Sequence, residues 1–322
     1  MSNYYIGVDL GGTKILTAIS NDKGEILKKI KLPTEAEKGK DHIIDNIVKS
    51  IENVMKSVDA DSEKIIRIGL GSPGPLNLEE GIIYTSPNLY WENVPVVKIL
   101  EERIGIEVSL ENDANAAALG EKWFGAGKGI NNMIYMTVST GIGGGIIIDN
   151  KILHGVNYGA GEIGHFIIEK DGPLCGCGNN GCFEAVASGT ALNRKGKYLA
   201  SMNPESLLYK LVDGDFNKID GKIIAKAAEM GDKLALGIWA DEAINLGIGI
   251  ANLLNIFNTE MVVLGGGVMN AWELFYDEMM KTIKEYAFES VYNSVEIRRS
   301  VLGSDVGVIG AIAVAMEDRL LK

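Results

Sequence analysis

The chain has 322 residues and carries 31 Lys and Arg against 43 Asp and Glu, a formal net charge of −12. At about 100–200 residues per domain, this length favours two domains. The acidic balance argues against nucleic acid or an anionic membrane as a partner. The first residues show no leader pattern, and no window of about 20 residues looks apolar enough to span a membrane, so we expect a cytoplasmic protein.

The first part of the chain alternates strand and helix patterns. Strands are expected at 4–9, 14–20, 26–32 and 65–70, the last ending in the tight run Gly-Ser-Pro-Gly-Pro at 71–75. The apolar residues at 41–58 keep helical spacing and predict an amphipathic helix. A further strand at 108–110 meets an alanine-rich helix that starts near Ala114.

A second unit of similar organisation starts near residue 133. Here a strand, a glycine turn and a returning strand repeat the opening arrangement, which indicates an internal duplication. Further helices are expected at 222–230, 233–256, 272–288 and 306–320, and the segment 261–269 is expected to be a strand that enters a third glycine turn. We place the boundary between the halves at a short hinge near 118–130, where the segment GAGKGINN supplies flexibility.

The first glycine turn joins the first two strands. Its glycines allow positive φ and remove side chains, so that backbone N–H groups can approach phosphate oxygens. A hydroxyl and an ammonium follow in the turn, and the acid at the strand end could hold Mg²⁺. A plain β-hairpin explains the glycines equally well. The candidate residues are Asp9, Gly11, Gly12, Thr13 and Lys14.

Two later glycine turns strengthen the case for a nucleotide. The second lies between two strands, so it is neither the dinucleotide fingerprint, which needs a following helix, nor a Walker A loop, which ends in Gly-Lys-Ser/Thr. The third turn could lie against adenine or ribose, or could be a simple strand-to-helix connection. The candidate residues are Thr140, Gly141, Gly143, Gly265, Gly266 and Gly267.

Asp113 lies where a strand gives way to the alanine-rich helix. Asp is a favoured helix N-cap, and the local pattern favours that interpretation. The strand ends of open α/β sheets also face the ligand crevice, where a carboxylate could accept the proton of an attacking hydroxyl. Both interpretations can hold together.

Three cysteines, Cys175, Cys177 and Cys182, fall in one glycine-rich loop, with His165 upstream. Three thiolates and one imidazole suit a closed tetrahedral zinc site. His165 is the less secure ligand because its spacing is long. The other two histidines, His42 and His154, have no evident partner in the sequence and are interpreted as ordinary residues.

Three segments together resemble the ROK family of repressors and kinases. They are GVDLGGTK near the N-terminus, ENDANAAALGE at 111–121, and the zinc-loop segment at 159–189. The likeness runs from residue 4 to the last helix and is greatest to bacterial ROK glucokinases. It implies an α/β fold of the actin-like ATPase (ribonuclease H-like) class, with two duplicated α/β lobes around a central cleft.

The resemblance also implies a division of labour along the chain. Residues 1–120 would form the N-terminal lobe, with the C-terminal helix 305–322 packing back on it. Residues 121–304 would form a larger lobe that carries the zinc loop. The expected ligands are ATP with Mg²⁺, structural Zn²⁺ and glucose or a related hexose, and the family suggests a homodimer or homotetramer.

Site roles follow from the matched motifs. Asp113 corresponds to the catalytic base, and His165 to a residue with one ring nitrogen on zinc and the other facing sugar. Sugar contacts are implied for Gly74, Asn112, Asp113, Glu162, His165 and Glu184. The alternatives are a kinase for N-acetylmannosamine, N-acetylglucosamine, fructose or allose, polyphosphate as donor, and a non-catalytic sugar-responsive regulator.

Overall fold

The computed structural model of the protein describes residues 3–321. The chain forms two compact units. Unit 1 takes the chain up to Tyr135, the segment Gly145–Gly161 and everything from Ser300 onward, whereas unit 2 takes Met136–Gly144 and Glu162–Arg299.

The predicted strands are present near their expected positions, together with five short strands of the described residues that were not predicted. They are β1 (Tyr4–Leu10), β2 (Lys14–Asn21), β3 (Ile26–Pro33), β4 (Ile65–Ser72), β5 (Leu76–Asn77), β6 (Ile82–Ser86), β7 (Trp91–Val94), β8 (Val108–Asn112), β9 (Met133–Val138), β10 (Ile142–Ile148), β11 (Lys151–Ile152), β12 (Met261–Gly265) and β13 (Glu296–Arg299).

The predicted helices are also present, with two differences, and five further helices of the described residues were not predicted. The last predicted helix is broken at Met316, and the segment predicted as a hinge, 118–130, is helical as far as Phe124. The helices are α1 (Lys40–Lys56), α2 (Val96–Ile104), α3 (Asp113–Phe124), α4 (Phe183–Ala187), α5 (Gly189–Ser201), α6 (Leu207–Lys210), α7 (Gly221–Glu229), α8 (Lys233–Phe257), α9 (Trp272–Tyr286), α10 (Glu289–Tyr292), α11 (Val306–Ala315) and α12 (Glu317–Leu320).

Two five-stranded sheets repeat one strand order. The first runs β3-β2-β1-β4-β8 and the second β11-β10-β9-β12-β13. In the first, β1, β2 and β3 pair antiparallel, while β4 and β8 join in parallel. The second sheet has the same strand directions at its two edges, because β10 and β11 pair antiparallel and β12 and β13 pair parallel. The matching order confirms the predicted duplication.

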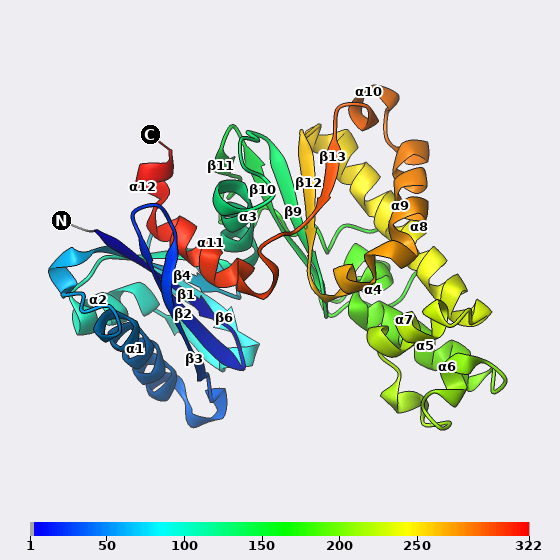
Figure 1. The fold of residues 1–322 in the computed structure, drawn as a ribbon, viewed down its shortest axis with the longest axis horizontal. Coiled ribbons are helices and arrows are strands. Elements are labelled where there is room, and N and C mark those ends of the chain that lie inside the picture. The colour runs from blue at the N-terminus through cyan, green and yellow to red at the C-terminus, as the bar shows by residue number, and fades with distance from the viewer. Residues whose placement is uncertain (1–2, 322) are drawn as a thin grey trace. The chain divides into compact units, whose positions relative to one another are not determined.

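Alternation along β1 divides the first sheet into two faces. Ile6 and Val8 belong to the hydrophobic cluster that includes α1, whereas Tyr5 belongs to the cluster that includes α11. Because successive side chains of a strand point to opposite faces, Gly7 and Asp9 lie on the α11 side. Helices α1 and α11 therefore cover opposite faces of the sheet, as Figure 1 shows.

The approach of α11 to this sheet is close enough to require glycine. A Cβ built on Gly7 would lie 2.6 Å from the backbone N of Ile312, and one on Gly69 would lie 1.9 Å from the backbone O of Ala311. On the other side of α11, a Cβ on Gly310 would lie 2.1 Å from the backbone O of Ala116 in α3. The helix is held between β1, β4 and α3 at backbone contact distance.

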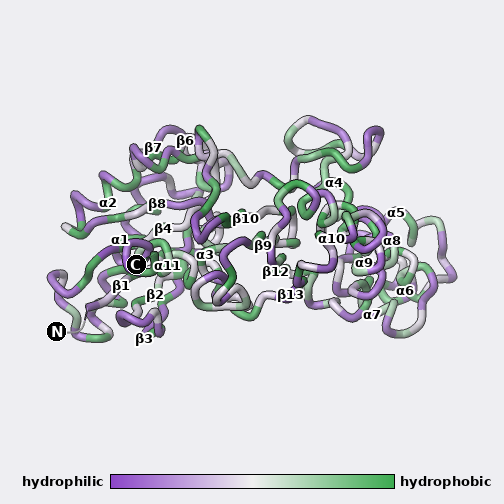
Figure 2. Tube along the Cα trace, turned by 90° about the horizontal axis from the view of Figure 1, so that it is seen from above, coloured by the Kyte–Doolittle hydropathy of each residue, from purple (hydrophilic) through white to green (hydrophobic). Residues whose placement is uncertain are grey.

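Strand β3 forms one edge of the first sheet and is largely exposed. Its sequence, ILKKIKLP, carries three lysines, and the hydrophilic colour of this strand is visible in Figure 2. Charged side chains on an edge strand discourage pairing with another chain.

One described helix, α8, is long and apolar enough by length and composition to cross a membrane, so the prediction that no window passes such a test is wrong. In the structure 56% of its most apolar window is buried. The helix packs along α9 and contacts α4, α5 and α7. Its hydrophobicity is accounted for by its place in the core of unit 2.

We expect Gly69→Ala to lower the free energy of unfolding by roughly 2–3 kcal/mol, because the new Cβ forces α11 away from the sheet. The matched control is Gly237→Ala in α8, where a Cβ meets nothing within 4 Å; there a gain of about 0.5–1 kcal/mol is expected from helix propensity. Urea unfolding measures both. Equal stability of Gly69→Ala and the wild type would contradict the close packing of α11.

Candidate functional site

The first glycine turn is fixed by hydrogen bonds on both sides. The N–H of Gly11 donates to the backbone O of Lys14 at 2.9 Å, and the hydroxyl of Thr34, after β3, donates to the backbone O of Gly11 at 2.6 Å. A Cβ on Gly12 would lie 2.8 Å from the Cβ of Asn88. The turn is therefore compact, and its glycines are needed for packing.

The prediction that these glycines serve positive φ is wrong for most of them. Of the predicted nucleotide-binding glycines, Gly266 alone has a left-handed backbone, at φ 91°. A Cβ there would lie 2.3 Å from the backbone O of Val138. In the other turns the missing side chain provides space, and the backbone conformation is open to any residue.

Asp9, at the end of β1, is half-buried beneath the start of α11. A Cβ on Gly307 would lie 2.7 Å from its carboxyl carbon. Burial raises the pKa of Asp9 above its ordinary 3.8, Lys14 opposes this, and the charge of Asp113 adds to the rise. Unit 1 thus brings the two predicted acids, Asp9 and Asp113, within electrostatic reach of each other.

At the junction of β8 and α3, the helix cap and the candidate base are two different residues. Asn112, and not Asp113, is the N-cap: its side-chain oxygen accepts from the N–H of Ala114 at 2.9 Å and of Asn115 at 3.3 Å. Asp113 is the first residue of the helix, and its exposed carboxylate accepts from the N–H of Ala114 at 2.8 Å. The interpretation of Asp113 as the cap is wrong.

Two residues near this junction were missed in the sequence. Glu111 is buried and accepts hydrogen bonds from the N–H of Asn112 and the side-chain amide of Asn115. Its other oxygen lies 2.8 Å from Nε2 of His154. No local pattern reveals this pair, because 43 residues separate its members.

His42, the second histidine interpreted as unpartnered, also has a partner. Its Nε2 lies 2.7 Å from Oε2 of Glu35.

Gly74, in the turn between β4 and β5, does have positive φ, at 119°. A Cβ there would lie 2.4 Å from the backbone O of Thr85. Only glycine fits both the backbone conformation and the contact.

In unit 2 the second glycine turn is joined to Glu184. The N–H of Ile142 donates to Oε2 of Glu184 at 3.0 Å, and a Cβ on Gly141 would lie 2.1 Å from the same oxygen. Glu184 is itself placed by its N–H, which donates to the backbone O of Gly164. A predicted sugar ligand and a predicted nucleotide turn therefore share one set of contacts.

The three cysteines of the loop and His165 form a compact cluster of potential metal ligands. The ligand atoms of His165, Cys175, Cys177 and Cys182 all lie within 4.8 Å of one another. Nδ1 of His165 lies 3.6 Å from Sγ of Cys175, and the sulfurs of Cys177 and Cys182 are 3.5 Å apart. A backbone hydrogen bond from Asn179 lowers the pKa of Cys177 to about 7, and burial raises that of Cys182 to about 12. This donor set fits tetrahedral zinc.

The imidazole of His165 faces two ways. Its Nδ1 points to the thiols, and its Nε2 lies 4.0 Å from Oε2 of Glu162. Phe166 and Phe183 hold this region in place, since the N–H of Phe183 donates to the backbone O of Phe166 and their ring centroids are 5.2 Å apart. A ligating histidine whose second nitrogen faces a carboxylate has a fixed orientation.

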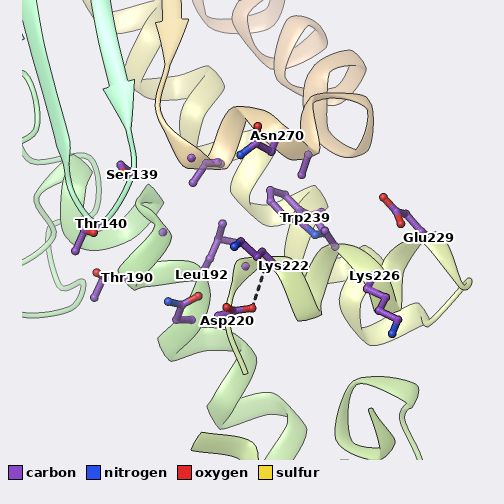
Figure 3. A pocket seen from close by; sticks show the side chains of 17 residues that line it. Ser139, Thr140, Thr190, Leu192, Asp220, Lys222, Lys226, Glu229, Trp239 and Asn270 are labelled. Carbon is purple, nitrogen blue, oxygen red and sulfur yellow. Dashed lines mark hydrogen bonds between the residues drawn. The ribbon is translucent and has the colours of Figure 1, made fainter. Parts of the chain in front are cut away.

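A pocket of about 570 Å³ lies in unit 2 beside the second and third glycine turns. Thr140 and Gly267 line it, which brings two of the predicted nucleotide turns together. Figure 3 shows the other side chains around it, including Ser139, Thr190, Asp220, Lys222, Trp239 and Asn270. No local sequence pattern indicates these residues together, because they come from five separate segments of the chain.

Two buried polar atoms of this pocket's lining have no partner among residues 3–321. They are Nε1 of Trp239, a donor, and Oδ1 of Asn193, an acceptor. Each of these atoms exposes less than 1 Å² of surface, so both lie beneath the pocket wall and do not face its interior. A second pocket, of about 270 Å³, adjoins Thr140, Gly141, Cys175, Glu184 and Arg194. Thr140 lines both pockets, so the second glycine turn borders both of them.

Comparison with known proteins finds relatives that match nearly the whole length of this chain. The sequence profile of the ROK family matches residues 5–318. The chain is 40% identical to a glucokinase of Thermotoga maritima over 97% of both chains, and 35% identical to a xylose repressor of Caldicellulosiruptor bescii over 98% of this chain and 78% of the repressor. Its fold resembles that of a ROK family glucokinase from Streptomyces griseus in complex with glucose and AMPPNP, with a TM-score of 0.81 and 36% identity over 98% of this chain and 100% of the other.

We expect the purified protein to hold one zinc per chain, bound by the four clustered side chains. Cys177→Ser should lose the metal and lower the melting temperature, because a structural zinc contributes directly to folding. The matched control is Asn179→Ser, since Asn179 contacts Cys177 at 3.7 Å without belonging to the cluster. Metal analysis in the absence of chelators measures the content. A wild-type protein free of zinc would contradict the site.

Proposed function

The chain belongs to the ROK family, and we propose that it is a glucokinase that transfers the γ-phosphate of ATP to the 6-hydroxyl of glucose. The relatives confirm the predicted α/β fold of the actin-like ATPase class. Identity of 40% to a glucokinase, over nearly the whole of both chains, supports the activity. The structural observation that carries the proposal is the exposed carboxylate of Asp113 beside a helix cap that Asn112 already supplies.

Asp113 would act as the general base. As the sugar oxygen attacks the γ-phosphorus and ADP leaves, the hydroxyl proton passes to the Asp113 carboxylate. Asp113 also acts on Asp9, because its charge adds to the rise in the pKa of Asp9 that burial mainly causes.

The sugar would be held by polar side chains around the cluster and at the end of β8. The oxygen of Asn112 is used by the helix cap, so its NH₂ group is the part that can donate to a sugar hydroxyl. Glu162 and Glu184 can each accept from two adjacent hydroxyls, and Nε2 of His165 faces the same side as Glu162. Gly74 would contribute its backbone.

The nucleotide would occupy the pocket in Figure 3. Thr140 and Gly141, with the first turn from Gly11 to Lys14, would contact phosphates, and Gly265, Gly266 and Gly267 would pass beside the base or ribose. A carboxylate such as Asp9 is the ligand type that Mg²⁺ prefers, and the bound ion would neutralise phosphate charge.

Zinc would act as a scaffold. With His165, Cys175, Cys177 and Cys182 as ligands, no position stays open for water, so the ion would fix His165 and supply no reactive group. The proposal also includes a cytoplasmic location, consistent with three free cysteines, and a homodimer or homotetramer without nucleic acid or membrane partners.

We expect Asp113→Asn to lower kcat by roughly 10²–10⁴, about 3–5 kcal/mol of barrier, because Asn cannot accept the proton. Glucose affinity and melting temperature should change little, since Asn112 keeps the cap. Asp41→Asn is the matched control: it makes the same change in the first turn of α1, where the side chain is 96% exposed. Steady-state kinetics measures kcat, calorimetry measures glucose affinity, and thermal melting measures stability, all on the same preparation. A variant that retains about half the activity would leave the base to another carboxylate, Glu162 first.

Substrate choice is tested separately by ATP consumption across a panel of hexoses and amino sugars. Glucose should give the highest kcat/KM. A value higher by about tenfold or more for N-acetylmannosamine, N-acetylglucosamine, fructose or allose, equivalent to about 1.4 kcal/mol of transition-state binding, would replace glucose as the substrate and leave the kinase assignment intact. Polyphosphate in place of ATP tests the donor. Sugar binding without turnover of any substrate would favour a regulator.

A further inference from the structure

Glu111 is the last side chain before the cap and the base, and it is almost fully buried, at 5% exposure. Its Oε1 accepts from the N–H of Asn112 at 2.9 Å and from Nδ2 of Asn115 at 3.0 Å. Strand β8 is the edge of its sheet, so this carboxylate, and no further strand, satisfies the Asn112 N–H. One oxygen of Glu111 thereby ties the last residue of β8 to the first turn of α3.

The second oxygen of Glu111 is held by His154, whose Nε2 lies 2.8 Å away. His154 follows β11 and begins a closed loop, since its backbone O accepts from the N–H of Ala160 at 3.1 Å. Within the loop, the ring of Tyr158 meets the imidazole edge-on with centroids 6.1 Å apart. The loop therefore fixes the position of the imidazole. The imidazole supplies a hydrogen-bond donor to the buried Glu111 carboxylate, whose burial without such a partner would cost free energy.

We propose that Glu111 and His154 are positioning residues for phosphoryl transfer: His154 orients the Glu111 carboxylate, which in turn fixes the strand end that carries Asn112 and Asp113. The proposal rests on the role of Asp113 as base. A base in proton transfer must meet its substrate within hydrogen-bond reach, and small displacements are expensive. Neither residue touches the reacting atoms in this scheme, because both act through the backbone and the cap.

The pair also predicts a pH dependence with a definite sign. The hydrogen bond to Glu111 raises the pKa of His154 above its ordinary 6.5, against a smaller opposing effect of burial, and Glu111 and Glu317 both add favourable charge. Glu317, on α12, is the other acid facing this site; burial raises its own pKa, with Arg67 and Asp318 acting on it. The charged pair is complete below about pH 6.5 and is lost as pH rises through the raised pKa.

Deprotonation removes the charge and leaves one ring N–H. A neutral imidazole can still donate to Glu111, so the charge-assisted part of the bond is what alkaline pH removes. We therefore expect the wild-type kcat to decline modestly on the alkaline side. This decline should be absent from a variant that keeps a donor at the same place and does not titrate.

The test compares His154→Leu, His154→Gln and His42→Leu in the full chain. His154→Leu removes the donor, and we expect kcat to fall roughly tenfold with KM for glucose within about twofold. His154→Gln keeps an N–H donor, so most of kcat should return and the alkaline decline should vanish. His42→Leu removes a comparable pair with Glu35, whose side chain is 32% exposed, and should leave kcat unchanged.

Two outcomes would overturn the proposal. One is a kcat of His154→Leu equal to that of the wild type at a temperature where both are folded. The other is an alkaline decline of kcat in His154→Gln that equals the decline in the wild type. This variant keeps an N–H donor for Glu111, so we expect it to fold. The Asp113→Asn variant, measured in parallel, distinguishes failure of the base assignment from failure of the positioning role. If that variant is active, the assignment of the base fails; if it is inactive while His154→Leu is normal, the positioning role alone fails.

Discussion

The contact of α11 with the first sheet is the constraint on which unit 1 depends. Two strand residues, Gly7 and Gly69, bring the helix to backbone distance, and Gly307 at its start leaves room for the carboxylate of Asp9. The packing that holds the helix therefore also buries Asp9, the acid that precedes the first glycine turn. Burial is the main cause of the raised pKa of Asp9. In this unit the fold and the electrostatics of the site cannot be altered separately.

Three consecutive side chains at the end of β8 perform three different tasks. Glu111 turns into the interior and fixes the junction, Asn112 caps α3, and Asp113 reaches solvent. Successive residues at a strand end point in different directions, so a short motif can serve both structure and chemistry. This separation explains why a carboxylate can be left exposed at a helix start without loss of the cap.

The sequence predicts periodic and local features well and long-range ones poorly. Strands, helices and the cysteine cluster follow from spacing, and the duplicated order of the sheets follows from the repeated strand–turn–strand pattern. The cap of α3 was misplaced by one residue, because Asn and Asp are about equally good caps and only geometry distinguishes them. The His154–Glu111 pair and the pocket around Trp239 need partners that are distant in sequence. The glycine turns were located correctly, but the reason for most of them is packing.

Glu184 illustrates how function should be separated from structure in unit 2. One of its oxygens accepts from the N–H of Ile142 beside the second glycine turn, and the other lies 3.9 Å from Sγ of Cys175. Replacement of Glu184 would therefore disturb the turn and the cysteine cluster together with any sugar contact. The side chain of Glu162 is 70% exposed, and its Oε2 lies 4.0 Å from Nε2 of His165. A loss of sugar affinity on replacing Glu162 would report on sugar recognition with far less interference from the fold.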